Sequence, residues 1–176
     1  MLRDSAKIQE EDARYEARKQ NPRGRQPKPL YTEEDARKTS KLFEPLPYHE
    51  WHEILDGVKL RFHFAGHILG AAIVELEVMD AGEWKRIVFT GDLGRRDQPI
   101  LMDPETIERC DALITESTYA DRVHPDQGDV KAELHRIICE AATRKGKVAI
   151  PAFSLGRTQM LVYLLNQLRN EEALCR

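Results

Sequence analysis

The pattern of apolar and polar positions changes near residue 58. Before it, residues 4–19 have the Glu-, Ala-, Arg- and Lys-rich composition of a helix, with only a thin apolar edge. Residues 20–29 hold three prolines among polar and basic residues, which predicts a flexible loop. Thr32, followed by three acidic residues, predicts the N-cap of a second helix. That helix should end near Glu44, because prolines follow it.

After residue 58 the pattern is that of strands followed by strands alternating with helices. Apolar positions at helical spacing predict helices over residues 128–144 and 155–168. Residues 80–83 predict a hairpin turn. Short apolar or alternating runs predict strands, of which the last two should be buried, over residues 58–64, 71–79, 85–90, 111–115 and 148–153. The fold class predicted is therefore α/β.

Composition limits the choice of protein class. The 176 residues, 41% of them hydrophobic, suffice for one domain, or for one domain and part of another. The net charge of -3 excludes a generally basic nucleic-acid coat but leaves room for a local basic groove. Cys110, Cys139 and Cys175 show no metal-binding spacing, so we expect reduced thiols. No apolar run approaches the ~18 residues of a membrane span, and we expect a cytoplasmic protein without a membrane partner.

Three of the strand-like runs end on residues that can bind a metal ion. His67 lies between Gly66 and Gly70, Asp92 follows an apolar run, and Glu116 follows the next. A lone histidine in a turn is more often structural, and a Gly-Asp pair is more often a simple turn. However, a buried carboxylate costs several kcal/mol unless a cation or donors compensate it. The pattern is typical of an incomplete metal-hydrolase site.

The other histidines are given ordinary interpretations. His63 should lie on the face of its strand opposite to two phenylalanines, and we do not expect it to be a ligand. The remaining four should be solvated in polar loops or on a polar helix face; they are His49, His52, His124 and His135.

A phosphate-binding turn is a second candidate feature. Ser154 and Arg157 lie between the last predicted strand and the last predicted helix. Free backbone N–H groups and the guanidinium at that helix start would suit a phosphate. The alternative, in which Ser154 only caps the helix, is equally well supported.

Four segments in order resemble motifs of the β-CASP branch of the metallo-β-lactamase superfamily. They are Ala65–Ala71, Phe89–Leu93, Thr115–Tyr119 and Ile150–Gln159. The branch includes the endonuclease of eukaryotic mRNA 3′-end cleavage, RNase J and many RNA-processing hydrolases. The resemblance implies a partial metallo-β-lactamase αβ/βα sandwich over residues 1–118, which lacks its N-terminal part. Residues 119–176 would be the truncated start of a β-CASP α/β domain.

The same resemblance implies roles for the strand-end residues. His67 would be a terminal ligand of one Zn²⁺, and Asp92 would bridge two Zn²⁺ and act in catalysis. Glu116 would be a catalytic residue that pairs with a downstream histidine near the leaving group. The implied activity is zinc-dependent cleavage of phosphodiester bonds in single-stranded RNA, and a homo-oligomer is compatible with it.

The resemblance also identifies motifs that this sequence lacks. The family's upstream His-x-His-x-Asp-His cluster and its two later histidine motifs do not occur. We therefore expect an internal piece of a longer enzyme, inactive by itself. Two alternatives stay open: a metallo-hydrolase of a small ester, thioester, lactone or phosphodiester, and a non-catalytic RNA-binding or scaffold remnant. The motifs at Thr115–Tyr119 and Ile150–Gln159 favour the ribonuclease over the first alternative.

Overall fold

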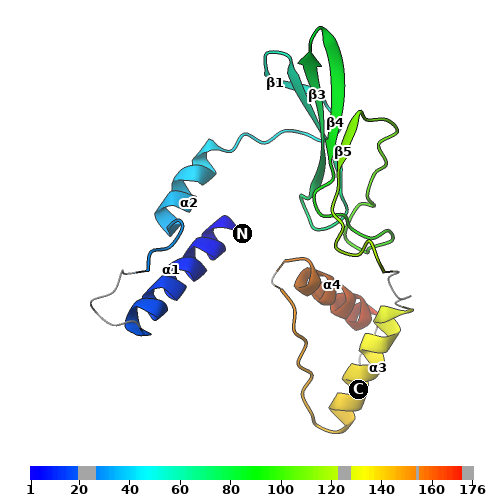
Figure 1. Cartoon of the computed structure of the whole chain (residues 1–176). Coiled ribbons are helices and arrows are strands. Elements are labelled where there is room, and N and C mark those ends of the chain that lie inside the picture. The colour runs from blue at the N-terminus through cyan, green and yellow to red at the C-terminus, as the bar shows by residue number, and fades with distance from the viewer. Residues whose placement is uncertain (20–26, 123–127, 154, 172–176) are drawn as a thin grey trace. The chain divides into compact units, whose positions relative to one another are not determined.

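The computed structural model describes residues 1–19, 27–122, 128–153 and 155–171. The chain divides into two compact units, Met1–Leu46 and Pro47–Arg176. Figure 1 labels the elements of both units. The predicted loop over residues 20–29 falls mostly outside the described residues. The predicted domain boundary near residue 118 stays a prediction.

The first unit consists of two helices and a short 3₁₀ turn. Helix α1 (Leu2–Lys19) contacts α2 (Glu33–Thr39), which continues into η1 (Ser40–Leu42). Thr32 is the N-cap of α2: its hydroxyl accepts from the Asp35 amide at 3.2 Å, and its own amide donates to the Asp35 carboxylate at 2.9 Å. The predicted N-cap is confirmed. The predicted thin apolar edge of Ile8, Ala13 and Tyr15 is not what α1 buries: Ile8 and Tyr15 are exposed, and Ala6 is the buried residue instead.

The second unit contains a five-stranded sheet in sequential order. Four strands are antiparallel, and the fifth pairs with the fourth in parallel. The strands are β1 (His52–Leu55), β2 (Val58–Phe64), β3 (Ala72–Asp80), β4 (Glu83–Phe89) and β5 (Ala112–Ile114). Strand β1 was not predicted; the other four were.

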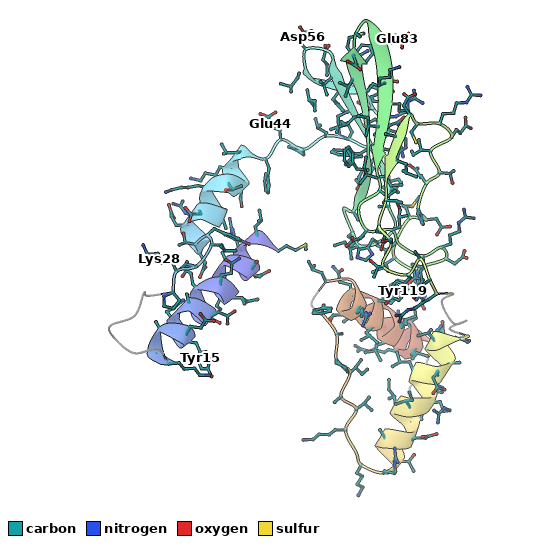
Figure 2. All side chains as sticks on the ribbon, in the orientation of Figure 1. Tyr15, Lys28, Glu44, Asp56, Glu83 and Tyr119 are labelled. Atoms are coloured by element: carbon teal, nitrogen blue, oxygen red, sulfur yellow. The ribbon has the colours of Figure 1, made fainter. Side chains whose placement is uncertain are left out.

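Strand direction decides where the candidate residues lie. Because β2 and β4 are both antiparallel to β3, they run in the same direction, and β5 runs with β4. The C-terminal ends of β2, β4 and β5 therefore lie at the same end of the sheet. Figure 2 shows Asp56 and Glu83 at the hairpin turns at one end, and Tyr119, which follows β5, at the other.

The two faces of the sheet differ in chemistry. Cross-strand partners lie on the same face, so Arg61 of β2 shares a face with its partner Glu75 of β3. Phe62 and its partner Val74 lie on the opposite, apolar face. Near the end of the sheet where the candidate site residues lie, the polar face carries a small core. It consists of Ala65, Ile73 and Val88, against which Ala71 and Ile107 pack.

The two remaining helices form their own apolar contact. Helix α3 (Val130–Thr143) packs against α4 (Arg157–Asn170) through Leu134, Leu164 and Leu168. Both helices were predicted, with ends that differ by a few residues. Cys139 of α3 is disulfide-bonded, so the expectation of three reduced thiols is wrong, because sequence spacing does not report which sulfurs meet in space. Cys110 is a free, exposed cysteine.

Two expectations about buried strands are wrong. Residues 148–153 form no strand, and Phe153 is 80% exposed. An apolar run becomes a strand only where a neighbouring edge satisfies its backbone groups, and none of the five described strands pairs with this one. Strand β5 does form, but Leu113 and Ile114 are about half exposed, because nothing in the described part of the chain covers them. No described helix is long and apolar enough to span a bilayer.

Candidate metal centre

The ends of β4 and β5 are joined directly by hydrogen bonds. The Thr90 amide donates to the Ile114 carbonyl at 3.0 Å, and the Thr90 hydroxyl bonds to that of Thr115 at 3.2 Å. Thr90 is buried, at 7% exposure. Asp92 and Glu116 therefore leave adjacent, fixed strand ends.

Two glycines bring the loop after β2 against the loop after β4. The Gly94 amide donates to the Ala65 carbonyl at 2.8 Å. A Cβ on Gly94 would lie 1.7 Å from the Gly66 carbonyl oxygen, so only glycine fits there. Gly66 itself has a φ of +66°, which few other residues adopt. This contact places His67 beside Asp92, with 3.7 Å between His67 Nε2 and Asp92 Oδ2.

The Glu116 carboxylate accepts hydrogen bonds at the same end of the sheet. The Leu93 amide donates to Glu116 Oε1 at 2.7 Å. This bond, together with a hydrogen bond from the Thr118 side chain, lowers the pKa of Glu116 below its ordinary value, and the nearby His67 acts in the same direction. Together these effects outweigh desolvation, which acts to raise the pKa of Glu116. Glu116 is therefore a carboxylate at neutral pH.

The three predicted site residues converge on one hollow. His67, Asp92 and Glu116 line it together with Arg157. The Asp92 side chain is 75% exposed, so the argument from a buried, uncompensated carboxylate is wrong for this residue. The loop contact at Gly66 and Gly94 positions it instead. The roles assigned to these residues stay predictions.

The predicted phosphate turn is described only in part. Ser154 lies outside the described residues, and Gly156 is the N-cap of α4. The Gly156 amide donates to the Gln159 side chain, and the Arg157 amide donates to the Leu155 carbonyl, both at 3.0 Å. Those two backbone donors already have partners, whereas Arg157 lines the hollow that contains His67 and Asp92.

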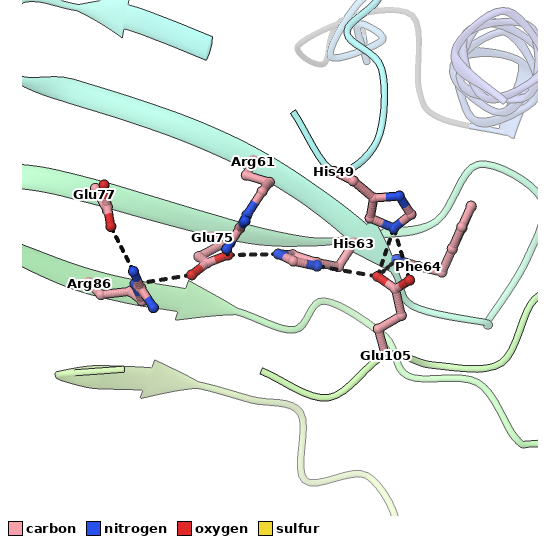
Figure 3. A network of polar contacts seen from close by, with 8 residues as sticks. All are labelled: His49, Arg61, His63, Phe64, Glu75, Glu77, Arg86 and Glu105. Atoms are coloured by element: carbon pink, nitrogen blue, oxygen red, sulfur yellow. Dashed lines mark hydrogen bonds and ion pairs between the residues drawn. The ribbon is translucent and has the colours of Figure 1, made fainter. Parts of the chain in front are cut away.

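Sequence reasoning missed a second cluster, drawn in Figure 3. His49 Nε2 lies 2.9 Å from Glu105 Oε1, and His63 Nδ1 lies 3.2 Å from Glu105 Oε2. Among the described residues, this is the one group of three potential metal ligands whose donor atoms all lie within 4.8 Å of one another. His49 is exposed, as expected, but it also contacts Glu105, which is distant in sequence and folds back onto it.

Glu75 connects this cluster to two arginines. It is fully buried, and its Oε2 lies 2.7 Å from both His63 Nε2 and Arg61 Nη2. Arg86 Nε lies 3.1 Å from Oε1. Burial acts to raise the pKa of Glu75, but the hydrogen bonds from His63 and Arg61 and the charges of both arginines outweigh it, so the pKa is lowered. The pairing of basic positions on β2 with acidic positions on β3 was a usable signal for this network.

The two other histidines of the described chain also differ from the expectation of simple solvation. His52 Nε2 is buried and has no hydrogen-bond partner among the described residues. His135 Nε2 lies 3.3 Å from Cys139 Sγ, one helical turn away. His124 lies outside the described residues.

Comparison with known proteins identifies the family. No family profile matches the chain. An RNase J-like protein of Methanocaldococcus jannaschii is 36% identical over 139 residues, which cover 77% of this chain and 32% of that protein. The transcription termination factor FttA of Methanococcus maripaludis is 36% identical over 145 residues, 80% of this chain and 22% of that protein. Cleavage and polyadenylation specificity factor 73 of Drosophila melanogaster is 33% identical over 139 residues, 78% and 20% respectively.

The chain belongs to the β-CASP branch of the metallo-β-lactamase superfamily. The predicted family is confirmed, and the sheet with its helices fits a partial metallo-β-lactamase fold, as predicted. The chain spans a third or less of the length of these relatives.

Membership of the β-CASP branch implies a metal cofactor, which is usually zinc. An imidazole nitrogen and a carboxylate oxygen are both zinc donors, and those of His67 and Asp92 lie 3.7 Å apart beside the hollow. They fit two positions of a coordination sphere. Catalytic zinc takes three protein ligands, and Glu116, the remaining carboxylate of the hollow, is already bonded to the Leu93 amide. The described residues therefore fit part of a zinc site.

Proposed function

We propose that this chain forms one wall of the active site of a metal-dependent ribonuclease that cleaves phosphodiester bonds in single-stranded RNA. The observation that carries the proposal is the convergence of His67, Asp92 and Glu116 from three strand ends on one hollow. The ribonuclease and RNA-processing names of its relatives agree with this. Further ligands would come from groups outside the described residues.

Each residue of the hollow has a task that its chemistry allows. Zinc would supply Lewis-acid chemistry, which polarises a phosphoryl oxygen and makes water a usable nucleophile near neutral pH. Asp92 can hold two ions, since its carboxylate has two oxygens, and His67 offers one ring nitrogen. The ionised Glu116 would orient a protonated histidine from outside the described residues, and that histidine would give its proton to the leaving oxygen. Arg157 would bind a phosphate of the RNA.

The test is RNA cleavage by the intact protein that carries this sequence, with zinc supplied. Asp92→Asn keeps the size of the side chain but removes its charge, so cleavage should fall to background and bound zinc should decrease. Asp80→Asn, an exposed aspartate at the end of β3, is the matched control and should cleave normally. Unchanged cleavage by Asp92→Asn would refute the proposal.

A non-catalytic RNA-binding role is the second candidate, because the described residues supply only part of a ligand set. It predicts RNA binding that does not depend on zinc, with no cleavage by the intact protein. Single-stranded and double-stranded RNA of one sequence, compared in the same assay, test the substrate class as well.

A further inference from the structure

We propose that His49, His63 and Glu105 form a second metal site that takes a divalent transition metal of the Zn²⁺ class. It shares no residue with the hollow that contains His67 and Asp92. The proposed ribonuclease function does not require it, and it does not depend on that function.

Backbone hydrogen bonds place the three donors before any side chain is considered. Beyond residue 60, the edge of β2 has no partner in β1 and is free to bind other segments. The His49 amide donates to the Phe62 carbonyl, and the Glu105 amide donates to the Phe64 carbonyl, both at 2.9 Å. His49 and Glu105 therefore flank His63, which lies between these two positions of the strand.

The ring of His63 lies between two carboxylates, Glu75 on one side and Glu105 on the other. Glu75 is an ionised, fully buried acceptor, so His63 Nε2 must donate its proton to it over 2.7 Å. In the neutral ring, Nδ1 then carries a lone pair. That lone pair lies 3.2 Å from Glu105 Oε2, which already accepts from the Phe64 amide at 3.1 Å. Two acceptors face each other, and either a proton or a metal ion must lie between them.

The spacing of the donors suits a metal ion. Two ligands on tetrahedral zinc, with bonds of ~2.0–2.1 Å, lie about 3.3 Å apart. Glu105 Oε2 lies 3.2 Å from His63 Nδ1 and 3.0 Å from His49 Nε2, so these two separations would need to change by only a few tenths of an ångström, and all three donor atoms lie within 4.8 Å of one another. Two imidazoles and one carboxylate form a recognised zinc ligand set that leaves a fourth position open. His49, whose side chain is 51% exposed, leaves a path from solvent.

The buried partner of His63 strengthens the inference. Histidines that bind metals commonly donate their other ring N–H to a carboxylate, which fixes the tautomer and the ring orientation. Glu75 does this for His63, and Arg61 and Arg86 balance its charge, as Figure 3 shows. Metal bound here would join the turn before β1, the strand β2 and the loop between β4 and β5.

The test is zinc binding to the whole chain in a His67→Ala, Asp92→Asn background, which silences the other centre. This background should bind one Zn²⁺ and gain thermal stability from it. His49→Asn, chosen because Asn tolerates the φ of +68° at this position, and Glu105→Gln should each weaken binding at least ~10-fold. Glu108→Gln, the same change at an exposed position of the same loop, should bind normally.

Histidine ring ¹⁵N spectra give a readout that does not depend on affinity. On adding zinc, His63 Nδ1 should shift as a metal ligand while Nε2 keeps its proton. The proposal is overturned if the background binds no zinc at micromolar concentrations, if both substitutions leave binding unchanged, or if the His63 Nδ1 resonance does not change when zinc is added. Loss of zinc binding by Asp92→Asn alone, with this site intact, would concern only the proposed ribonuclease centre.

Discussion

At the scale of single residues, two glycines decide the geometry of the hollow that contains His67 and Asp92. Gly66 and Gly94 let the loops after β2 and β4 touch through their backbones. That contact sets the positions of His67 and Asp92. The charged residues contribute the chemistry, but they do not position themselves. Asp92 is mostly exposed and would be free to turn elsewhere if the loops separated.

Gly94→Ala should therefore separate the loops. The added Cβ would lie within 2.0 Å of two Gly66 backbone atoms, and backbone cannot rotate away as a side chain can. We expect a loss of about 3 kcal/mol in the free energy of unfolding, at the upper end for overpacking, together with loss of the zinc binding that we propose for His67 and Asp92. Urea unfolding measures the first effect.

Gly146→Ala is the matched control. Its Cβ would meet the Ala141 carbonyl oxygen at 3.4 Å, an ordinary contact, so the change in stability should stay within about 0.5 kcal/mol. Equal effects of the two substitutions would show that the backbone contact is not what limits stability.

At the scale of elements, the polar face of the sheet depends on one buried carboxylate. Glu75→Gln keeps the shape of the side chain but leaves Arg61 and Arg86 without their shared anion. Removing one partner of a buried ion pair costs about 3 kcal/mol, which urea unfolding should detect.

Glu83→Gln provides the comparison on the same sheet. Glu83 pairs with Lys85 at 2.9 Å, but its side chain is 75% exposed. Exposed pairs contribute about 0–1 kcal/mol, so this variant should unfold almost like the parent. If Glu75→Gln were equally stable, the arginines would have to find other partners.

The cap of α2 should respond to pH. Hydrogen bonds from the Thr32 amide and then from its hydroxyl lower the pKa of Asp35 below its ordinary value. Because this pKa is lowered, Asp35 stabilises the helix fully at pH values above its ordinary pKa. This contribution is lost as the pH falls through the pKa of the folded state. An NMR titration of the Asp35 carboxyl carbon should give a midpoint below 3.8.

Thr32→Ala removes the hydroxyl but keeps the amide, so the Asp35 midpoint should rise only part of the way back. Asp35→Asn should abolish the acid-dependent change in α2, as followed by its amide shifts. A midpoint unaffected by Thr32→Ala would mean that the hydroxyl does not contribute to the cap in solution.

At the scale of the whole molecule, the two units should unfold independently. Met1–Leu46 and Pro47–Arg176 are separate compact units. The sheet and its small core belong entirely to the second one. Residues 47–176 alone should therefore keep the far-ultraviolet signature of the sheet and a thermal midpoint close to that of the whole chain. A midpoint that falls by more than a few degrees would show that the first unit stabilises the second.

Among the described elements, the sequence by itself determined four strands, the four α-helices and the three residues at the strand ends. These depend on local patterns: alternation, helical spacing, a cap, and glycines beside polar residues. The motifs around His67, Asp92 and Glu116 also sufficed to identify the family. Such signals survive in a short window, because each is set by a few neighbouring side chains.

Only the tertiary structure decided which edges find partners and which distant side chains meet. Residues 148–153 have the pattern of a strand, but no described edge pairs with them. His49, His63 and Glu105 carry no local sign of proximity, because the free edge of β2 brings them together through backbone hydrogen bonds. Strand pairing and side-chain convergence join segments far apart in the chain, so no single stretch of sequence contains the information.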